Sequence, residues 1–182
     1  MSKIVVLSNA HCKEDPGASG FGFTEYAYSC QVNEVIKTKL VGAGIDCRIV
    51  DGGKGNASAT LKQKAELINA INPVCAVENH LNAAANATAS YGSETIHWQG
   101  SSAGKALAES VSRQFKYLPF KEKGATGRSD LYLLRKTKCP AIITEPLFLS
   151  HELESKYLSY KRGIEVLGQL IAEGITSWVN SR

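Results

Sequence analysis

Three ionisable residues stand shortly after apolar runs of the sequence, at places where strands of a sheet would end. His11, His80 and Glu145 each follow such a run. Imidazole nitrogens and carboxylate oxygens are zinc ligands, and a catalytic zinc keeps one further position open for water. The metal lowers the pKa of that water towards ~7, and a nearby carboxylate can pass the proton to a leaving amine. These residue types therefore indicate two histidines and one glutamate on a metal, with a second glutamate as general base.

The histidines alone are a weak signal, because the sequence lacks a His-Glu-x-x-His motif and the ligands would come from distant segments. A single histidine more often has a structural or surface role. Glu25 has an ordinary explanation as well, since carboxylates are favoured at helix N-termini. Glu145 differs because it follows an apolar strand, where an unpaired buried carboxylate is costly. Its position therefore favours a functional role.

Apolar, β-branched runs alternate along the chain with longer segments of helical periodicity. This alternation predicts an α/β fold with one domain, residues 1–182, in which helices flank a largely parallel twisted sheet of about six strands. Ligands in such folds bind in loops beyond the carboxyl ends of the strands. The expected strands are 3–7, 47–50, 74–77, 93–98, 131–134 and 141–144, and the expected helices are 25–40, 58–71, 101–117, a stretch from 150, and 162–179.

The composition suits an ordinary globular protein. The 182 residues are 43% hydrophobic and 21% charged, which argues against disorder. No apolar run approaches the ~20 residues of a membrane helix, so membrane insertion is not expected. The net charge of +4 comes without a dense Lys/Arg cluster, which argues against nucleic-acid binding. The five cysteines are odd in number and lack Cys-x-x-Cys spacing, so reduced thiols are expected.

Four segments, in order, resemble motifs of zinc-dependent N-acetylmuramoyl-L-alanine amidases of the type 3 catalytic domain. Residues 11–18, HCKEDPGA, are similar to the family's opening histidine followed by Asp-Pro-Gly-Ala. Residues 80–83, HLNA, resemble its His-x-Asn-Ala segment, and residues 92–94, GSE, resemble its Gly-x-Glu strand. Residues 131–145 resemble the stretch that ends in its catalytic glutamate. Each match alone is weak, and the ordered set is a strong signal.

The resemblance implies a Zn²⁺ site formed by His11, Glu25 and His80, with Glu145 as the general base. Zinc would polarise the substrate carbonyl for attack by water, and Glu145 would return the proton to the departing nitrogen of L-alanine. The implied reaction is hydrolysis of the amide bond between N-acetylmuramic acid and L-alanine in peptidoglycan, which lyses the cell wall.

Further side chains are candidates for orienting the ligands or contacting the substrate: Glu78, Asn82, Glu94 and Arg128. Glu78 shares the strand parity of His80 and is expected on the same side. Asn82 is expected to act through its backbone. Glu94 and His97 have opposite parity, so His97 is expected at the surface. Arg128 is a candidate partner for peptide carboxylates, although a solvated role is as plausible.

Other functions fit parts of the pattern. A metallopeptidase that cleaves within the stem peptide would use the same metal ligands, and a non-catalytic module of the same fold would bind muropeptide. A flavodoxin-like nucleotide-binding domain is disfavoured because residues 9–18 contain one glycine and no phosphate loop. A lysozyme-type glycosidase would use paired carboxylates without histidines.

The first residues show no secretory signal pattern, because Met1 is followed directly by a predicted strand. Synthesis in the cytoplasm and release to the wall in the manner of a phage or prophage endolysin are therefore expected. A host amidase domain trimmed from a longer exported chain is the alternative. A monomer is expected, without a separate cell-wall-binding domain.

Overall fold

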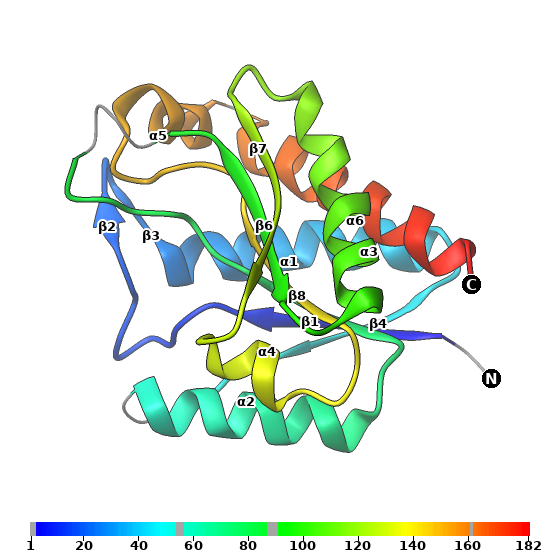
Figure 1. The fold of residues 1–182 in the computed structure, drawn as a ribbon. Helices are drawn as coiled ribbons and strands as arrows, with labels where there is room; N and C mark the ends of the chain where they lie inside the picture. Colours follow the sequence, from blue (N-terminus) through cyan, green and yellow to red (C-terminus); the bar gives the residue numbers. More distant parts are fainter. Residues whose placement is uncertain (1–2, 54–56, 87–90, 161) are drawn as a thin grey trace.

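The computed structural model describes residues 3–53, 57–86, 91–160 and 162–182. Helices cover both faces of a twisted six-stranded sheet (Figure 1). In spatial order the strands are β4 (Asp46–Val50), β1 (Ile4–Asn9), β5 (Cys75–Asn79), β8 (Ala141–Glu145), β6 (Ser93–Trp98) and β7 (Glu122–Arg128). A two-stranded hairpin, β2 (Ser19–Gly20) and β3 (Phe23–Thr24), lies beside this sheet.

The helices follow the strands in the alternation that the sequence predicts. They are α1 (Glu25–Gly42), α2 (Ala57–Ile71), α3 (Ser102–Ser112), the 3-10 helix η1 (Arg113–Tyr117), α4 (Tyr132–Lys136), α5 (Glu152–Ser159) and α6 (Gly163–Asn180). None of the helices in the described ranges is long and apolar enough to span a membrane.

Each face of the sheet has its own hydrophobic core. Val5 and Leu7 of β1 pack with α1, α3 and α6 in the larger core. Val6, between them, faces the smaller core under α2 and α4. Because side chains alternate along a strand, odd-numbered residues of β1 and β5 face α1 and even-numbered ones face α2.

The direction of the strands decides which residues meet at one edge. Strands β4, β1, β5 and β8 are parallel to one another, so their carboxyl ends share one edge of the sheet. Strand β6 runs antiparallel to β8 and begins at that edge, where Glu94 pairs with Glu145. The catalytic candidates at the ends of β1, β5 and β8 therefore meet the start of β6.

One predicted element is wrong, and one strand of the six-stranded sheet was not predicted. Residues 131–134, expected as a strand, contribute instead to the short helix α4, in which Leu133 and Leu134 are buried. A short apolar run does not distinguish a strand from a buried helical turn, and the place beside β8 is taken by β6. Strand β7 was not predicted, because Gly124 and Gly127 interrupt its pattern and its side chains are mostly exposed.

Candidate metal centre

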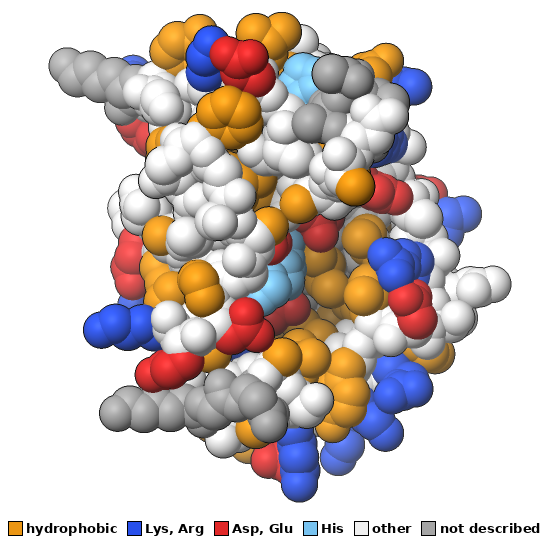
Figure 2. All heavy atoms as spheres, turned by 90° about the vertical axis from the view of Figure 1, so that its left-hand side faces the viewer, with side chains coloured by type: hydrophobic (Ala, Val, Ile, Leu, Met, Phe, Trp, Pro, Cys, Tyr) orange, Lys and Arg blue, Asp and Glu red, His pale blue; other side chains and the backbone are white. Residues whose placement is uncertain are grey.

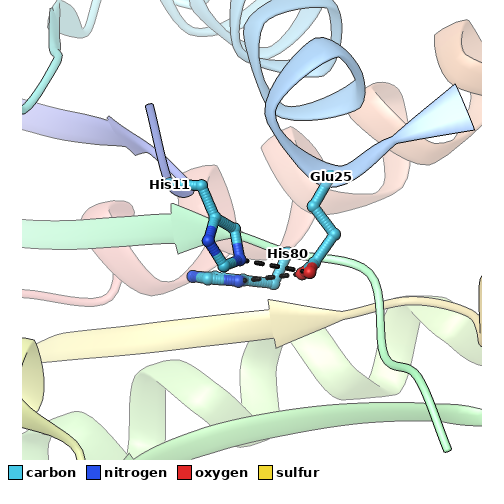
Figure 3. A group of neighbouring side chains, drawn as sticks. All are labelled: His11, Glu25 and His80. Atoms are coloured by element: carbon cyan, nitrogen blue, oxygen red, sulfur yellow. Dashed lines mark hydrogen bonds and ion pairs between the residues drawn. The ribbon is translucent and has the colours of Figure 1, made fainter. Parts of the chain in front are cut away.

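His11, Glu25 and His80 converge beyond the carboxyl ends of β1 and β5 (Figure 3). His11 Nε2 lies 3.1 Å from Glu25 Oε2, and His80 Nδ1 lies 3.1 Å from Glu25 Oε1. One potential ligand atom from each residue lies within 4.8 Å of the other two. Two imidazoles and one carboxylate at this spacing are a donor set that fits a zinc ion with a position left for water.

The backbone around Glu25 is built to fix its carboxylate. Thr24 caps α1 by accepting a hydrogen bond from the Ala27 amide, which places Glu25 in the first turn of the helix. The amides of Ala18 and Leu81 donate to its two carboxylate oxygens, at 2.8 and 3.3 Å. Glu25 is thus held at 6% exposure between the two histidines.

Gly17 permits the close approach of the ligands. Its φ is +74°, and a Cβ there would lie 2.5 Å from the His11 ring and 2.7 Å from Glu25 Oε2. His11 itself has a φ of 59°, in the left-handed region that a residue other than glycine seldom adopts. The Pro-Gly turn after His11 therefore provides both the bend and the space that the three side chains need.

The pKa shifts of Glu25 and His80 show that this site favours positive charge. Burial would raise the pKa of Glu25, but the hydrogen bonds with His11 and His80 outweigh it and hold the pKa well below its usual range. Burial would lower the pKa of His80, but the carboxylates of Glu25 and Glu78 raise it to about 10. In the metal-free protein a proton on His80 thus provides the positive charge that the carboxylates favour.

Glu78 and Lys64 form a buried ion pair behind His80. Lys64 Nζ lies 2.9 Å from Glu78 Oε1, and both side chains are at most 2% exposed. The Ser8 hydroxyl donates to the same oxygen at 3.0 Å, and Glu78 Oε2 lies 3.2 Å from His80 Nε2. Burial would raise the pKa of Glu78, but contacts with His80 and Lys64 lower it to about 2. The expectation that Glu78 faces the same side as His80 is confirmed.

The Glu145 carboxyl group has one oxygen, Oε2, that is buried without a hydrogen-bond partner among the described residues. Desolvation, together with the nearby carboxylates of Glu25, Glu94 and Glu78, raises its pKa to about 8, against the attraction of His80. A carboxyl group that readily exchanges a proton near neutral pH therefore adjoins the three ligands.

The other candidates differ in their surroundings. Asn82 closes the site loop through its backbone, which exchanges hydrogen bonds with Leu147 and Leu149 at 3.0 and 2.7 Å. Glu94 lies opposite Glu145 in the backbone register of the antiparallel strands β6 and β8. Arg128 lies opposite Trp98 at the far end of β6, and its guanidinium pairs with Asp130.

The prediction that His97 lies at the surface is wrong. His97 is 5% exposed and its Nδ1 lies 2.8 Å from the Trp98 carbonyl. His97 and Glu94 face opposite sides of the sheet, as expected, but α3 packs against β6 on the side of His97. The lone histidine is a buried structural residue and not a partner-facing one.

A pocket of about 210 Å³ begins at His11 and His80 and extends between the N-terminal ends of α2 and α4. Figure 2 shows this face hollowed, with a histidine in the hollow, carboxylates beside it and hydrophobic side chains along the wall. Apolar wall residues include Ala57, Leu61, Leu131 and Ile143.

Lys64 is a residue that sequence reasoning missed. The sequence did indicate that Lys64 is buried, because it stands one turn before Ile68 on the apolar side of α2. A charge buried there requires a partner of opposite charge.

The sequence model of a family described as N-acetylmuramoyl-L-alanine amidase matches residues 5–177, which is nearly the whole chain. The chain belongs to this family. It is an enzyme that hydrolyses the amide bond between N-acetylmuramic acid and L-alanine in peptidoglycan. Membership favours this reaction over cleavage within the stem peptide and over a non-catalytic muropeptide-binding module.

Individual relatives agree with the family. An endolysin of Bacillus phage SPP1 is 26% identical over 187 residues, which cover 99% of this chain and 67% of the endolysin. The CwlD amidase from Clostridioides difficile, solved in complex with the GerS lipoprotein, superposes with a TM-score of 0.89 at 22% identity, over 100% of both chains. The catalytic domain of the CwlV amidase from Bacillus (Paenibacillus) polymyxa var. colistinus gives 0.86 at 23% identity, over 99% of both chains. These likenesses confirm the predicted fold class of the amidase.

Proposed function

We propose that the metal of this amidase is Zn²⁺, held by His11, Glu25 and His80, and that Glu145 is the general base. The observation that carries the proposal is the meeting of three ligand atoms within 4.8 Å near a glutamate, Glu145, whose Oε2 atom is buried and lacks a partner among the described residues. Bound zinc would supply a Lewis acid that polarises the scissile carbonyl and lowers the pKa of water.

The protein's own residues move the protons. Glu145 takes a proton from the attacking water and gives it to the amide nitrogen as L-alanine departs. The raised pKa of about 8 makes the protonated form a competent acid, and a nearby cation would favour the ionised form that accepts the proton. Glu78 accepts a hydrogen bond from His80 Nε2, which leaves Nδ1 free to bind metal.

The apolar pocket between α2 and α4 is the place where the substrate would be held. It adjoins His11 and His80, so a group bound there would lie next to the scissile amide. Pockets of this kind gain affinity from apolar walls and orientation from a few polar groups. We propose that it receives the apolar part of the muropeptide beside the cleaved bond.

The remaining expectations complete the proposal. The enzyme acts on the cell wall as a monomeric catalytic domain comprising residues 1–182 and is released in the manner of an endolysin. The SPP1 endolysin supports the last point by its name and its similarity. Glu94 and Arg128 remain candidates for contacts with the peptide.

The test compares zinc-loaded wild type with Glu145→Gln and with Glu173→Gln, an exposed carboxylate on α6. Mass spectrometry of digested peptidoglycan should show stem peptides with a free L-alanine amino terminus for wild type and Glu173→Gln. Glu145→Gln should retain zinc and lose on the order of 10²–10⁴-fold in turnover, the usual contribution of a positioned base. Full turnover by zinc-loaded Glu145→Gln would exclude Glu145 as the base, and a wild type without zinc affinity would exclude the metal site.

A further inference from the structure

A chain of buried polar side chains crosses the sheet directly beneath the proposed metal site. The Thr144 hydroxyl donates to Asn79 Oδ1 at 2.6 Å, and Asn79 Nδ2 donates to Asn33 Oδ1 at 2.6 Å. Asn33 Nδ2 donates to Asn9 Oδ1 at 2.7 Å, and Asn9 Nδ2 donates to Asp51 Oδ2 at 3.0 Å. The network spans the carboxyl ends of the four neighbouring strands β8, β5, β1 and β4, and Asn33 of α1 bridges the side chains of Asn79 and Asn9, which are register partners in the sheet.

The side chains of this network are polar, yet most of them are buried. Asn33, Asn79 and Thr144 are fully buried and Asn9 is 6% exposed. An apolar core residue would fill each of these places without needing a hydrogen-bond partner, whereas a buried amide requires one. Four successive hydrogen bonds join Thr144, Asn79, Asn33, Asn9 and Asp51, so these side chains form one connected network.

Members of the network are neighbours in sequence of the proposed ligands and base. Asn79 directly precedes His80, Thr144 directly precedes Glu145, and Asn9 stands two residues before His11. Asn79 and Thr144 each face α1, on the opposite side of the sheet from the residue that follows.

The fourth functional residue is connected as well. Tyr26, which follows Glu25 at the start of α1, donates its hydroxyl to Asp51 Oδ2 at 2.9 Å. The network therefore reaches the backbone within two residues of each of the four residues to which the proposed function assigns chemistry. Its central member, Asn33, lies on α1 two turns after Glu25.

We propose that Asn33 is a positioning residue, which joins the ends of β1 and β5 and so holds His11 and His80 at the separation that zinc binding requires. The inference rests on the proposed function, because it assumes those ligands. Asn33 touches neither the metal ligands nor the pocket, and it acts through Asn9 and Asn79. Metal ligands need supports of this kind, since their orientation decides affinity.

The test replaces Asn33 by leucine, which is similar in size and forms neither hydrogen bond. Zinc affinity is measured by competition with a chromophoric chelator, and kcat and KM are measured on peptidoglycan fragments. Loss of a partner that orients metal ligands typically costs 10–100-fold in affinity or activity. We expect a fall of about tenfold or more in zinc affinity for Asn33→Leu, with kcat lowered more than KM is raised.

A matched control separates positioning from general stability. The Ser110 hydroxyl donates to the Gly174 carbonyl at 2.8 Å, is also buried, and joins α3 to α6 away from the site. Ser110→Ala should lower thermal stability while zinc affinity and kcat stay at the wild-type values. If Asn33→Leu behaves in the same way as Ser110→Ala, the network is only structural and the proposal is overturned.

A second variant decides the matter if Asn33→Leu does not fold. Thr144→Val keeps the shape of the side chain and removes the donor at the end of the network. It should lower zinc affinity severalfold in the same chelator competition, and wild-type zinc affinity in this variant would refute the positioning role. Failure of the proposed function is distinguishable, because the wild type itself would then neither bind zinc at His11, Glu25 and His80 nor depend on Glu145.

Discussion

Zinc binding should release protons, because two groups of the site are protonated at pH 7 in the metal-free protein. Carboxylate neighbours raise the pKa of His80 to about 10, and burial raises that of Glu145 to about 8. A histidine must be neutral to bind a metal, so His80 gives up its proton. The charge of the metal also favours ionised Glu145.

The size of the effect follows from these two values. Below pH 8 both groups lose a proton on binding, so apparent zinc affinity should rise roughly a hundredfold per pH unit. Between pH 8 and 10 only His80 is protonated, and the slope falls to roughly tenfold per unit. Above pH 10 the affinity should stop rising with pH.

Calorimetric titration in two buffers of different ionisation enthalpy measures the number of protons released. We expect close to two at pH 6.5 for wild type and close to one for Glu145→Gln, which has no carboxyl proton to lose. A wild type that releases none would refute the account of both groups. An equal number in wild type and Glu145→Gln would refute the raised pKa of Glu145.

Three substitutions examine other parts of the site. Lys64→Met removes the lysine partner of the buried Glu78 carboxylate, which keeps its contacts with Ser8 and His80, and should lower the free energy of unfolding by about 1.5–3 kcal/mol. Lys64→Met with Glu78→Gln should regain most of this loss; urea denaturation is the measurement, and no recovery in the double variant would contradict the ion-pair account. Gly17→Ala places a methyl group against His11 and should weaken zinc binding by roughly tenfold or more in chelator competition, and unchanged affinity would show that the turn adapts. Leu61→Trp fills the pocket and should raise KM severalfold with zinc affinity unchanged, whereas an unchanged KM would exclude the pocket from substrate binding.

The meeting of His11, His80 and Glu145 could be predicted because each follows a strand of a largely parallel sheet, and parallel strands end at one edge. Their approach to Glu25 needed more than periodicity, since the Pro-Gly turn and the helix cap place that carboxylate. The family resemblance provided Glu25 where the periodicity did not.

Other features depended on tertiary context that the sequence pattern does not contain. The antiparallel direction of β6 brings Glu94 to the site edge, and nothing in residues 93–98 indicates that direction. His97 was assigned to the surface from parity alone, but both faces of a central strand are covered. The asparagines beneath the site find partners 24 to 46 residues away in the chain, so no local pattern indicates the network that they form.

The hydrogen bonds of the polar network beneath the site can run in only one donor-to-acceptor direction. Asp51, at one end, accepts hydrogen bonds when ionised and has none to donate, so the amide of Asn9 must turn its nitrogen towards it. That choice fixes the amide of Asn33, which fixes Asn79, which in turn requires the donor of Thr144. A surface carboxylate at the edge of the sheet thus sets the rotamers of side chains three strands away. A single amide cannot rotate unless its neighbours rotate with it, so the floor of the catalytic centre has one hydrogen-bonded arrangement instead of several.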